Sequence, residues 1–112
     1  MLHNDAQRIM EALEGAGGAA HCTRGWPKSF EKLPCIAVSE AGNTPAAFLD
    51  DEVYMDELIY DVRVFAIQSG DKDRIAASVE EIMHGLRYTR VLVYDEDTAD
   101  VRMKVMRYRT YR

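Results

Sequence analysis

The chain has 112 residues, of which 47% are hydrophobic and 29% charged, and this composition is typical of one folded domain. Its hydrophobic content excludes disorder as the main state, and no apolar stretch reaches the roughly 20 residues that a membrane-spanning helix needs. A net charge of −5 disfavours nucleic acid as the main partner, because strong phosphate binding usually requires a basic surface.

The first third of the chain predicts one helix and one strand. Asn4 and Gln7 have the spacing of a capping box, and a helix is expected over Asp5–Glu14 because apolar residues then recur on one face, namely Ala6, Ile9, Met10 and Leu13. Glycines end this helix, and residues 15–33 show no clean period, so we expect an irregular connection there. A short strand is predicted over Pro34–Ser39.

The stretch from Ala41 to Asp56 predicts a long loop, because it begins with the turn cluster Gly42-Asn43-Thr44-Pro45. Phe48 and Leu49 follow without a periodic partner in the subunit core. An apolar pair on a long loop is best covered by another protein, so we expect the loop to be mobile alone and to order against a partner. The alternative, that Phe48 folds over the sheet edge and the segment extends a hairpin, stays open.

The second half predicts a long strand, a helix and a hairpin. Alternating residues indicate a strand over Met55–Gln68, and Asp71 is expected to cap a helix with one apolar stripe, Ile75, Val79, Ile82, Met83 and Leu86. The polar side of this helix is expected to carry Lys72, Asp73, Glu80 and Glu81. Two further strands, Tyr88–Tyr94 and Val101–Tyr108, would be joined by the acidic turn Asp95-Glu96-Asp97-Thr98.

The order of these elements, α-β-β-α-β-β, predicts an α+β fold in a single domain spanning residues 1–112. Short connections favour a largely antiparallel β-sheet with two helices packed on one face. In that arrangement Val79 and Ile82 should face the side of the sheet that carries Val62 and Val64.

Residues that could carry chemistry are few. Cys22 and Cys35 are expected to be free thiols, because a disulfide framework needs more cysteines and an oxidising compartment, and the N-terminus lacks the features of a signal peptide. With His21 and His84 they match no compact zinc motif. A cysteine nucleophile with a histidine base would need a proximity that the sequence does not supply. We therefore predict no enzyme, catalytic residue, metal or cofactor.

Charge is unevenly distributed along the chain. Residues 40–61 hold seven acids and no base, whereas residues 87–112 hold seven bases and four acids. Adjacent strands of one subunit could pair these charges, or an acidic face of one subunit could meet a basic face of the next. The C-terminal strand interleaves Arg107 and Arg109 with Tyr108 and Tyr111. This pattern suits either a solvated strand end or a small nucleic-acid-binding module, which is the alternative function.

Several segments resemble, in order, the tail-completion or tail-terminator proteins of long-tailed bacteriophages and prophages. The resemblance begins at Leu33-Pro34-Cys35-Ile36, Asn43-Thr44-Pro45-Ala46 and Asp51-Glu52-Val53-Tyr54, and it continues through Ile59-Tyr60-Asp61-Val62-Arg63-Val64. It then takes in Val79-Glu80-Glu81-Ile82-Met83, Arg87-Tyr88, Tyr94-Asp95-Glu96-Asp97-Thr98 and Lys104-Val105-Met106-Arg107-Tyr108. It thus covers roughly residues 33–110.

This resemblance implies a structural protein that forms a ring, usually a hexamer, at the head-proximal end of the tail tube. The expected partners are further copies of the chain, the tail tube protein and the head-tail connector proteins, with phage DNA passing through the lumen without specific binding and no membrane involved. The expected location is the virion tail, after assembly in the host cytoplasm. Candidate residues for contacts with copies or partners are Phe48, Leu49, Asp50, Asp51, Tyr54, Arg107 and Arg109.

Overall fold

The structure, a computed structural model, describes residues 4–30, 32–49 and 52–112, without the side chains of residues 46–49 and 52–54. Its elements follow the order α1 (Ala6–Leu13), a 3₁₀ turn η1 (Ala16–Gly18), β1 (His21–Arg24), β2 (Cys35–Leu49), β3 (Glu52–Ala66), α2 (Ser69–Gly85), β4 (Thr89–Asp95) and β5 (Arg102–Tyr111). The expected α+β class is confirmed for this part of the chain.

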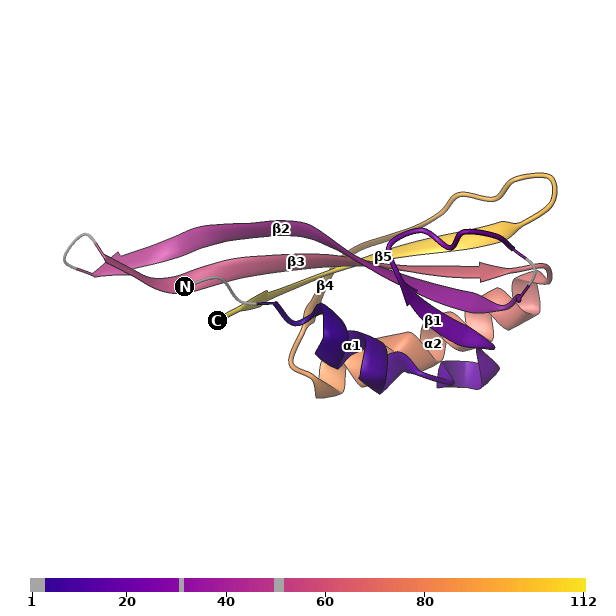
Figure 1. Cartoon of the computed structure of the whole chain (residues 1–112), viewed down its shortest axis with the longest axis horizontal. Helices are drawn as coiled ribbons and strands as arrows, with labels where there is room; N and C mark the ends of the chain where they lie inside the picture. The colour runs from indigo at the N-terminus through magenta and orange to yellow at the C-terminus, as the bar shows by residue number, and fades with distance from the viewer. Residues whose placement is uncertain (1–3, 31, 50–51) are drawn as a thin grey trace.

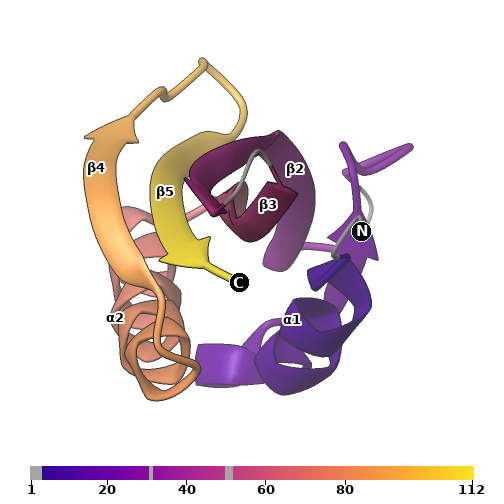
Figure 2. The same cartoon turned by 90° about the vertical axis from the view of Figure 1, so that its left-hand side faces the viewer.

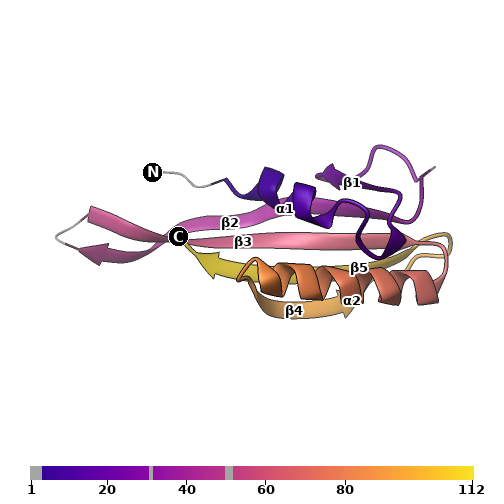
Figure 3. The ribbon, with the colours of Figure 1, turned by 90° about the horizontal axis from the view of Figure 1, so that it is seen from below.

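The five strands form one mixed sheet in the order β1-β2-β3-β5-β4. β1 is parallel to β2, and the other neighbouring strands are antiparallel. Figures 2 and 3 show α1 and α2 side by side across the same face of the sheet. The sheet is therefore less antiparallel than the sequence predicted, because the connection over residues 15–33 contains β1, a strand that the prediction missed.

The β2–β3 hairpin makes the molecule elongated. Its principal extents are 52 × 25 × 23 Å, and Figure 1 shows the end of the hairpin projecting far beyond the helices. We call residues 40–49 and 52–56 the arm. The loop predicted over residues 41–56 is wrong for the described residues, since β2 runs through the turn cluster, with register shifts after Glu40 and Pro45, and β3 begins at Glu52. Bulges of this kind absorb residues that a regular ladder would not accept. The alternative that this segment extends a hairpin is confirmed for the described backbone.

The main core lies between the sheet and the helices. Ile75, Val79 and Met83 of α2 are buried with Val62 and Val64 of β3, as the helical stripe predicted. Ile82 of the same stripe is partly exposed at the rim of the core. Other buried members of the main core are Ile9, Leu13, Ile36, Val38, Leu58, Tyr60, Met106 and Tyr108. A second, smaller cluster occupies the opposite face and includes Cys35, Ala37, Phe65, Met103 and Val105. The pleat alternation of β2, β3 and β5 thus supplies apolar side chains to both faces.

Both helix starts differ in detail from the sequence prediction. Asn4 accepts a hydrogen bond from the Ala6 backbone, but Gln7 donates to Glu11 instead of completing a capping box. α2 begins at Ser69, so Asp71 lies in the first turn and pairs with Arg74 at 2.8 Å instead of capping the helix. An acid in the first turn still interacts favourably with the helix dipole.

The glycines after α1 allow a close approach between η1 and α2. A Cβ atom on Gly17 would lie 2.8 Å from the backbone Cα of Ile75, and the φ of Gly17 is +59°. Arg74 donates from Nε to the Gly17 carbonyl at 2.9 Å. A side chain at this position would collide with α2, which gives the glycine-rich segment a packing role.

Candidate assembly surfaces

The edge strand β4 is exposed along its whole length. Its seven residues are all exposed, and they include four consecutive large hydrophobic residues, Val91, Leu92, Val93 and Tyr94, with exposures of 46%, 37%, 38% and 46%. An edge strand offers a row of unpaired backbone groups, and an uncovered apolar one invites pairing with another strand. This strand therefore has the features of a protein interface.

The arm holds three of the seven site residues predicted from the sequence. Asp50 and Asp51 lie outside the described residues. Phe48 and Leu49 lie in β2 and Tyr54 in β3, with Phe48 paired to Val53 in the backbone register, and their side chains are outside the description. The structure thus places the backbones of these candidates at the end of a two-stranded ribbon, distant from the helices (Figure 1).

The two C-terminal arginines have partners within the subunit. Arg107 donates from Nε and a terminal nitrogen to Asp61, at 2.8 and 3.0 Å, across the β3–β5 pair. This hydrogen bonding and the attraction to the carboxylate raise the pKa of Arg107. The Arg109 guanidinium lies 5.7 Å from the centre of the Tyr111 ring. Tyr108 is buried and donates to Glu80 at 2.6 Å, so it does not share a surface with the arginines.

At this point of the sheet the acidic middle and the basic C-terminal part of the chain pair within one subunit. The Asp61–Arg107 contact joins residues that are directly opposite in the β3–β5 register. Such a pair neutralises Asp61, whose side chain is 6% exposed. Arg107 is therefore less available for phosphate than the sequence pattern indicated, which weakens the case for a nucleic-acid module.

The C-terminus is fixed to the N-terminus through Asp5. Its carboxylate accepts hydrogen bonds from the Tyr88 hydroxyl at 2.7 Å and from Arg112 Nε at 3.1 Å. Burial alone would raise the pKa of Asp5, but the bonds from Tyr88 and Arg112 outweigh it and lower the pKa below its ordinary value. This polar cluster closes the end of the core next to the arm.

A buried lysine anchors the end of β4 to α2. Lys72 is 3% exposed, although the sequence placed it on the polar side of its helix. Its ammonium group lies 3.1 Å from Asp95 and 3.2 Å from Asp97. Burial alone would lower the pKa of Lys72, but these hydrogen bonds raise it. The carboxylates come from a distant segment, so helical periodicity could not predict the burial.

His21 lies opposite Cys35 in the β1–β2 register, but neither of the two thiols has the lowered pKa of a reactive cysteine. Cys22 and Cys35 are free thiols on the adjacent strands β1 and β2, and burial raises the pKa of the Cys22 thiol to about 12 and that of Cys35 to about 11. Because the thiolate is the nucleophilic form, such thiols are poor nucleophiles near neutral pH. Within residues 4–30, 32–49 and 52–112, no group of three or more His, Cys, Asp or Glu residues could hold a metal ion.

A small aromatic cleft lies on the sheet face opposite the helices. Trp26 and Phe30, in the segment that connects β1 to β2, have their ring centroids 5.4 and 5.2 Å from that of Phe65. The cleft encloses about 310 Å³ and is completed by Glu96, Thr98, Val101 and Met103 from the β4–β5 end of the sheet. The sequence prediction missed it, because residues 15–33 show no periodicity.

Two comparisons with known protein sequences found no relative. A scan against protein-family models found no match, and a search of curated proteins found no significant similarity. In the part of the chain that the structure describes, no helix combines the length and apolar character needed to span a membrane.

Proposed function

We propose that this chain is a structural subunit of a phage tail, which caps the head-proximal end of the tail tube as a ring and joins the tail to the head. The observation that carries the proposal is the uncovered apolar strand β4, which calls for a protein partner. The ordered resemblance of residues 33–110 to tail-completion proteins indicates the kind of assembly. In this proposal the ring, a hexamer by that resemblance, contacts the tail tube protein on one side and connector proteins on the other.

The projecting arm suits contacts between different components of such a tail. A two-stranded ribbon is marginally stable by itself in water, so an arm that extends beyond the helices gains stability by lying against another protein. Its sequence is acidic around Asp50, Asp51 and Glu52. Acidic side chains toward the lumen would repel DNA phosphates and let the duplex slide, whereas basic ones would hold it.

Electron microscopy tests the proposal directly. Negatively stained purified protein, alone and mixed with tail tubes that lack a terminator, should show rings, with one ring at a single end of each tube. Tubes whose ends stay bare at a protein concentration where rings are present would contradict a tail-capping function.

The arm has its own test. In the double variant Phe48→Ser and Leu49→Ser, we expect a melting temperature close to that of the parent chain but a loss of ring formation or of tail joining. The single variant Thr44→Ser, at an exposed position of the same strand, serves as the control. A double variant that unfolds, while its folded fraction joins tails normally, would place both residues in the core of the subunit instead.

A further inference from the structure

We infer that copies of this chain join edge to edge, with β4 of one copy pairing in antiparallel fashion with β1 of the next. The inference rests on the proposed ring but concerns its subunit contact, which nothing so far assigns. β1 and β4 are the two outer strands of the five-stranded sheet. A head-to-tail contact joins two different surfaces of the same chain, and these edges are two such surfaces.

Strand directions agree with this pairing. β1 runs parallel to β2, and three antiparallel steps from β2 to β3, β5 and β4 leave β4 running opposite to β1. A rotation about an axis parallel to the strands keeps each strand's direction. The β4 strand of one copy therefore meets the β1 strand of the next copy in the antiparallel sense, which continues the sheet from one copy to the next.

The register of the sheet also specifies which residues meet. One row of register partners crosses the whole sheet: Asp95, Lys104, Val64, Ile36 and Cys22. Asp95 and Cys22, at the two ends of this row, therefore lie at the same position along the strand direction. A second row of partners, two residues further along the strands, runs from Val93 through Met106, Val62 and Val38 to Arg24. A rotation without a shift along the axis therefore brings Asp95 opposite Cys22, and Val93 opposite Arg24.

Backbone groups at these positions point outward on both strands. Glu96 donates its backbone N–H to Met103 of β5, so by alternation the backbone groups of Asp95 and Val93 face away from the sheet. Gly25 donates to Val38 of β2, and alternation within β1 turns the groups of Cys22 and Arg24 outward. Both pairs thus have the orientation of the closely bonded pairs in an antiparallel ladder.

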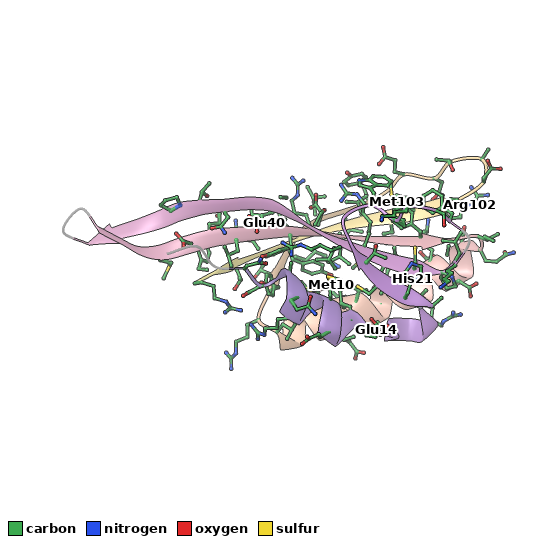
Figure 4. All side chains as sticks on the ribbon, viewed as in Figure 1. Met10, Glu14, His21, Glu40, Arg102 and Met103 are labelled. Carbon is green, nitrogen blue, oxygen red and sulfur yellow. The ribbon has the colours of Figure 1, made fainter. Side chains whose placement is uncertain are left out.

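Charge favours the same contact. The end of β4 and the turn after it carry Asp95, Glu96, Asp97 and Asp100, of which Asp95 and Asp97 also pair with Lys72. Residues 21–32 carry Arg24, Lys28 and Lys32, with Glu31 as the one acid of that stretch. These three cations are exposed and form no ion pair with another described residue. Figure 4 shows that His21 of β1 and Arg102, which begins β5, both lie toward the end of the molecule away from the arm. The acidic and basic stretches would therefore meet at the same height.

His21 supplies a further indication. Its Nδ1 atom is buried and has no hydrogen-bond partner among the described residues. The register above places the exposed Glu96 of the neighbouring copy opposite His21. A rotation of the partly exposed imidazole toward that carboxylate would let Nδ1–H donate a hydrogen bond to it, and leaving a buried polar atom unpaired is costly.

Disulfide cross-linking tests the contact. All chains in the assay carry Cys22→Ala and Cys35→Ala, because Cys22 lies on the inferred contact and could itself react. In this background, chains with Arg24→Cys and chains with Val93→Cys are mixed and oxidised, and non-reducing electrophoresis then shows which chains are linked. Within one chain these positions lie four strand spacings apart, about 19 Å, so a bond between them must join two copies. We expect a dimer band from the mixture and none from either variant alone.

The matched control is Thr23→Cys mixed with Val93→Cys, because Thr23 is adjacent to Arg24 but faces the other side of the sheet. We expect its cross-linked yield to be at least about tenfold lower. Cross-linking of Val93→Cys chains alone would indicate a two-fold β4–β4 contact and overturn the inference, as would a mixture without dimers or an equal yield from the control. The assay contains no tail tubes, so a positive result beside bare tube ends would refute the proposed function and leave this contact standing.

Discussion

The outer edge of β2 in the arm and the outer edge of β4 are protected to very different degrees. The β2 edge carries Pro45 and register shifts after Glu40, Pro45 and Ala47. Asp56, the partner of Pro45, directs its backbone bonds to Arg112, which places the Pro45 nitrogen on the outer edge. Proline and bulges there discourage pairing with another strand.

The β4 edge has no comparable protection. It contains no proline, its one register shift lies between Arg90 and Leu92, and four large apolar residues are exposed. The difference teaches that the two edges have different roles: the arm edge is built against strand addition, whereas the β4 edge remains open to it. The predictions that follow test this difference, from the largest expected effect to the smallest.

The first prediction separates core residues from interface residues. Ile75→Ala, at a fully buried position of α2, should lower the free energy of unfolding by roughly 2–5 kcal/mol, because it leaves a cavity in the main core. Val93→Ala on the exposed edge should lower it by less than about 1 kcal/mol. Urea unfolding of both variants below the concentration of assembly measures the two effects. Equal losses would show that β4 belongs to the core of the subunit.

The second prediction concerns the anchor of β4. Burial alone would raise the pKa of Asp95, but its bonds to Lys72 and Lys104 lower it. A carboxyl group with a lowered pKa stabilises the folded state above its unfolded pKa of about 4, and this stabilisation is lost as the pH falls through the folded value. Asp95→Asn should thus cost about 1 kcal/mol or less near neutral pH, because Asp95 is half-exposed.

Urea midpoints near pH 6 and near pH 3 measure this effect. The parent chain should lose more stability between the two conditions than Asp95→Asn does. An identical loss in both proteins would mean that Asp95 does not anchor β4 through its charge.

The third prediction concerns salt. The acidic residues at and after the end of β4 attract the basic residues within the stretch 21–32 of the next copy across the inferred contact. Salt weakens this attraction, because the Debye length falls from about 10 Å at 0.1 M to about 3 Å at 1 M salt. We expect self-association to weaken a few-fold over this range, since exposed ion pairs contribute little each. Light scattering across a salt series measures it. An assembly indifferent to salt would leave the apolar residues of β4 as the main source of affinity.

Sequence patterns predicted the parts of this fold that depend on local periodicity. The apolar stripe of α2 placed Val79 correctly in the main core. The prediction missed β1, because four residues with no distinct alternation give no strand signal. It favoured a loop over the β2 arm, with the hairpin extension as the alternative, since the turn-like Gly42–Pro45 cluster lies inside a bulged strand. The burial of Lys72 depends on carboxylates more than twenty residues away, which no local pattern reveals.

The candidate site was predictable to a smaller extent. Arg107 was identified from its sequence, but its pairing with Asp61 follows from the β3–β5 register. The exposed apolar surface of β4 was missed, because alternation predicts a strand without showing whether that strand lies at an edge or in the centre. Whether a strand lies at an edge depends on how all the strands pair, and the edge position of β4 makes the exposed residues Val91–Tyr94 a candidate interface.

The most direct test of β4 as the surface where copies join is the mass of two matched lysine variants in sedimentation equilibrium. Val93→Lys puts a charge on the open edge, and Thr44→Lys puts the same charge on an exposed position of the protected arm edge. The account predicts that Val93→Lys remains a folded monomer of about 12.7 kDa, while Thr44→Lys assembles like the parent chain. Assembly of folded Val93→Lys at parental strength, or its loss in Thr44→Lys instead, would contradict the account.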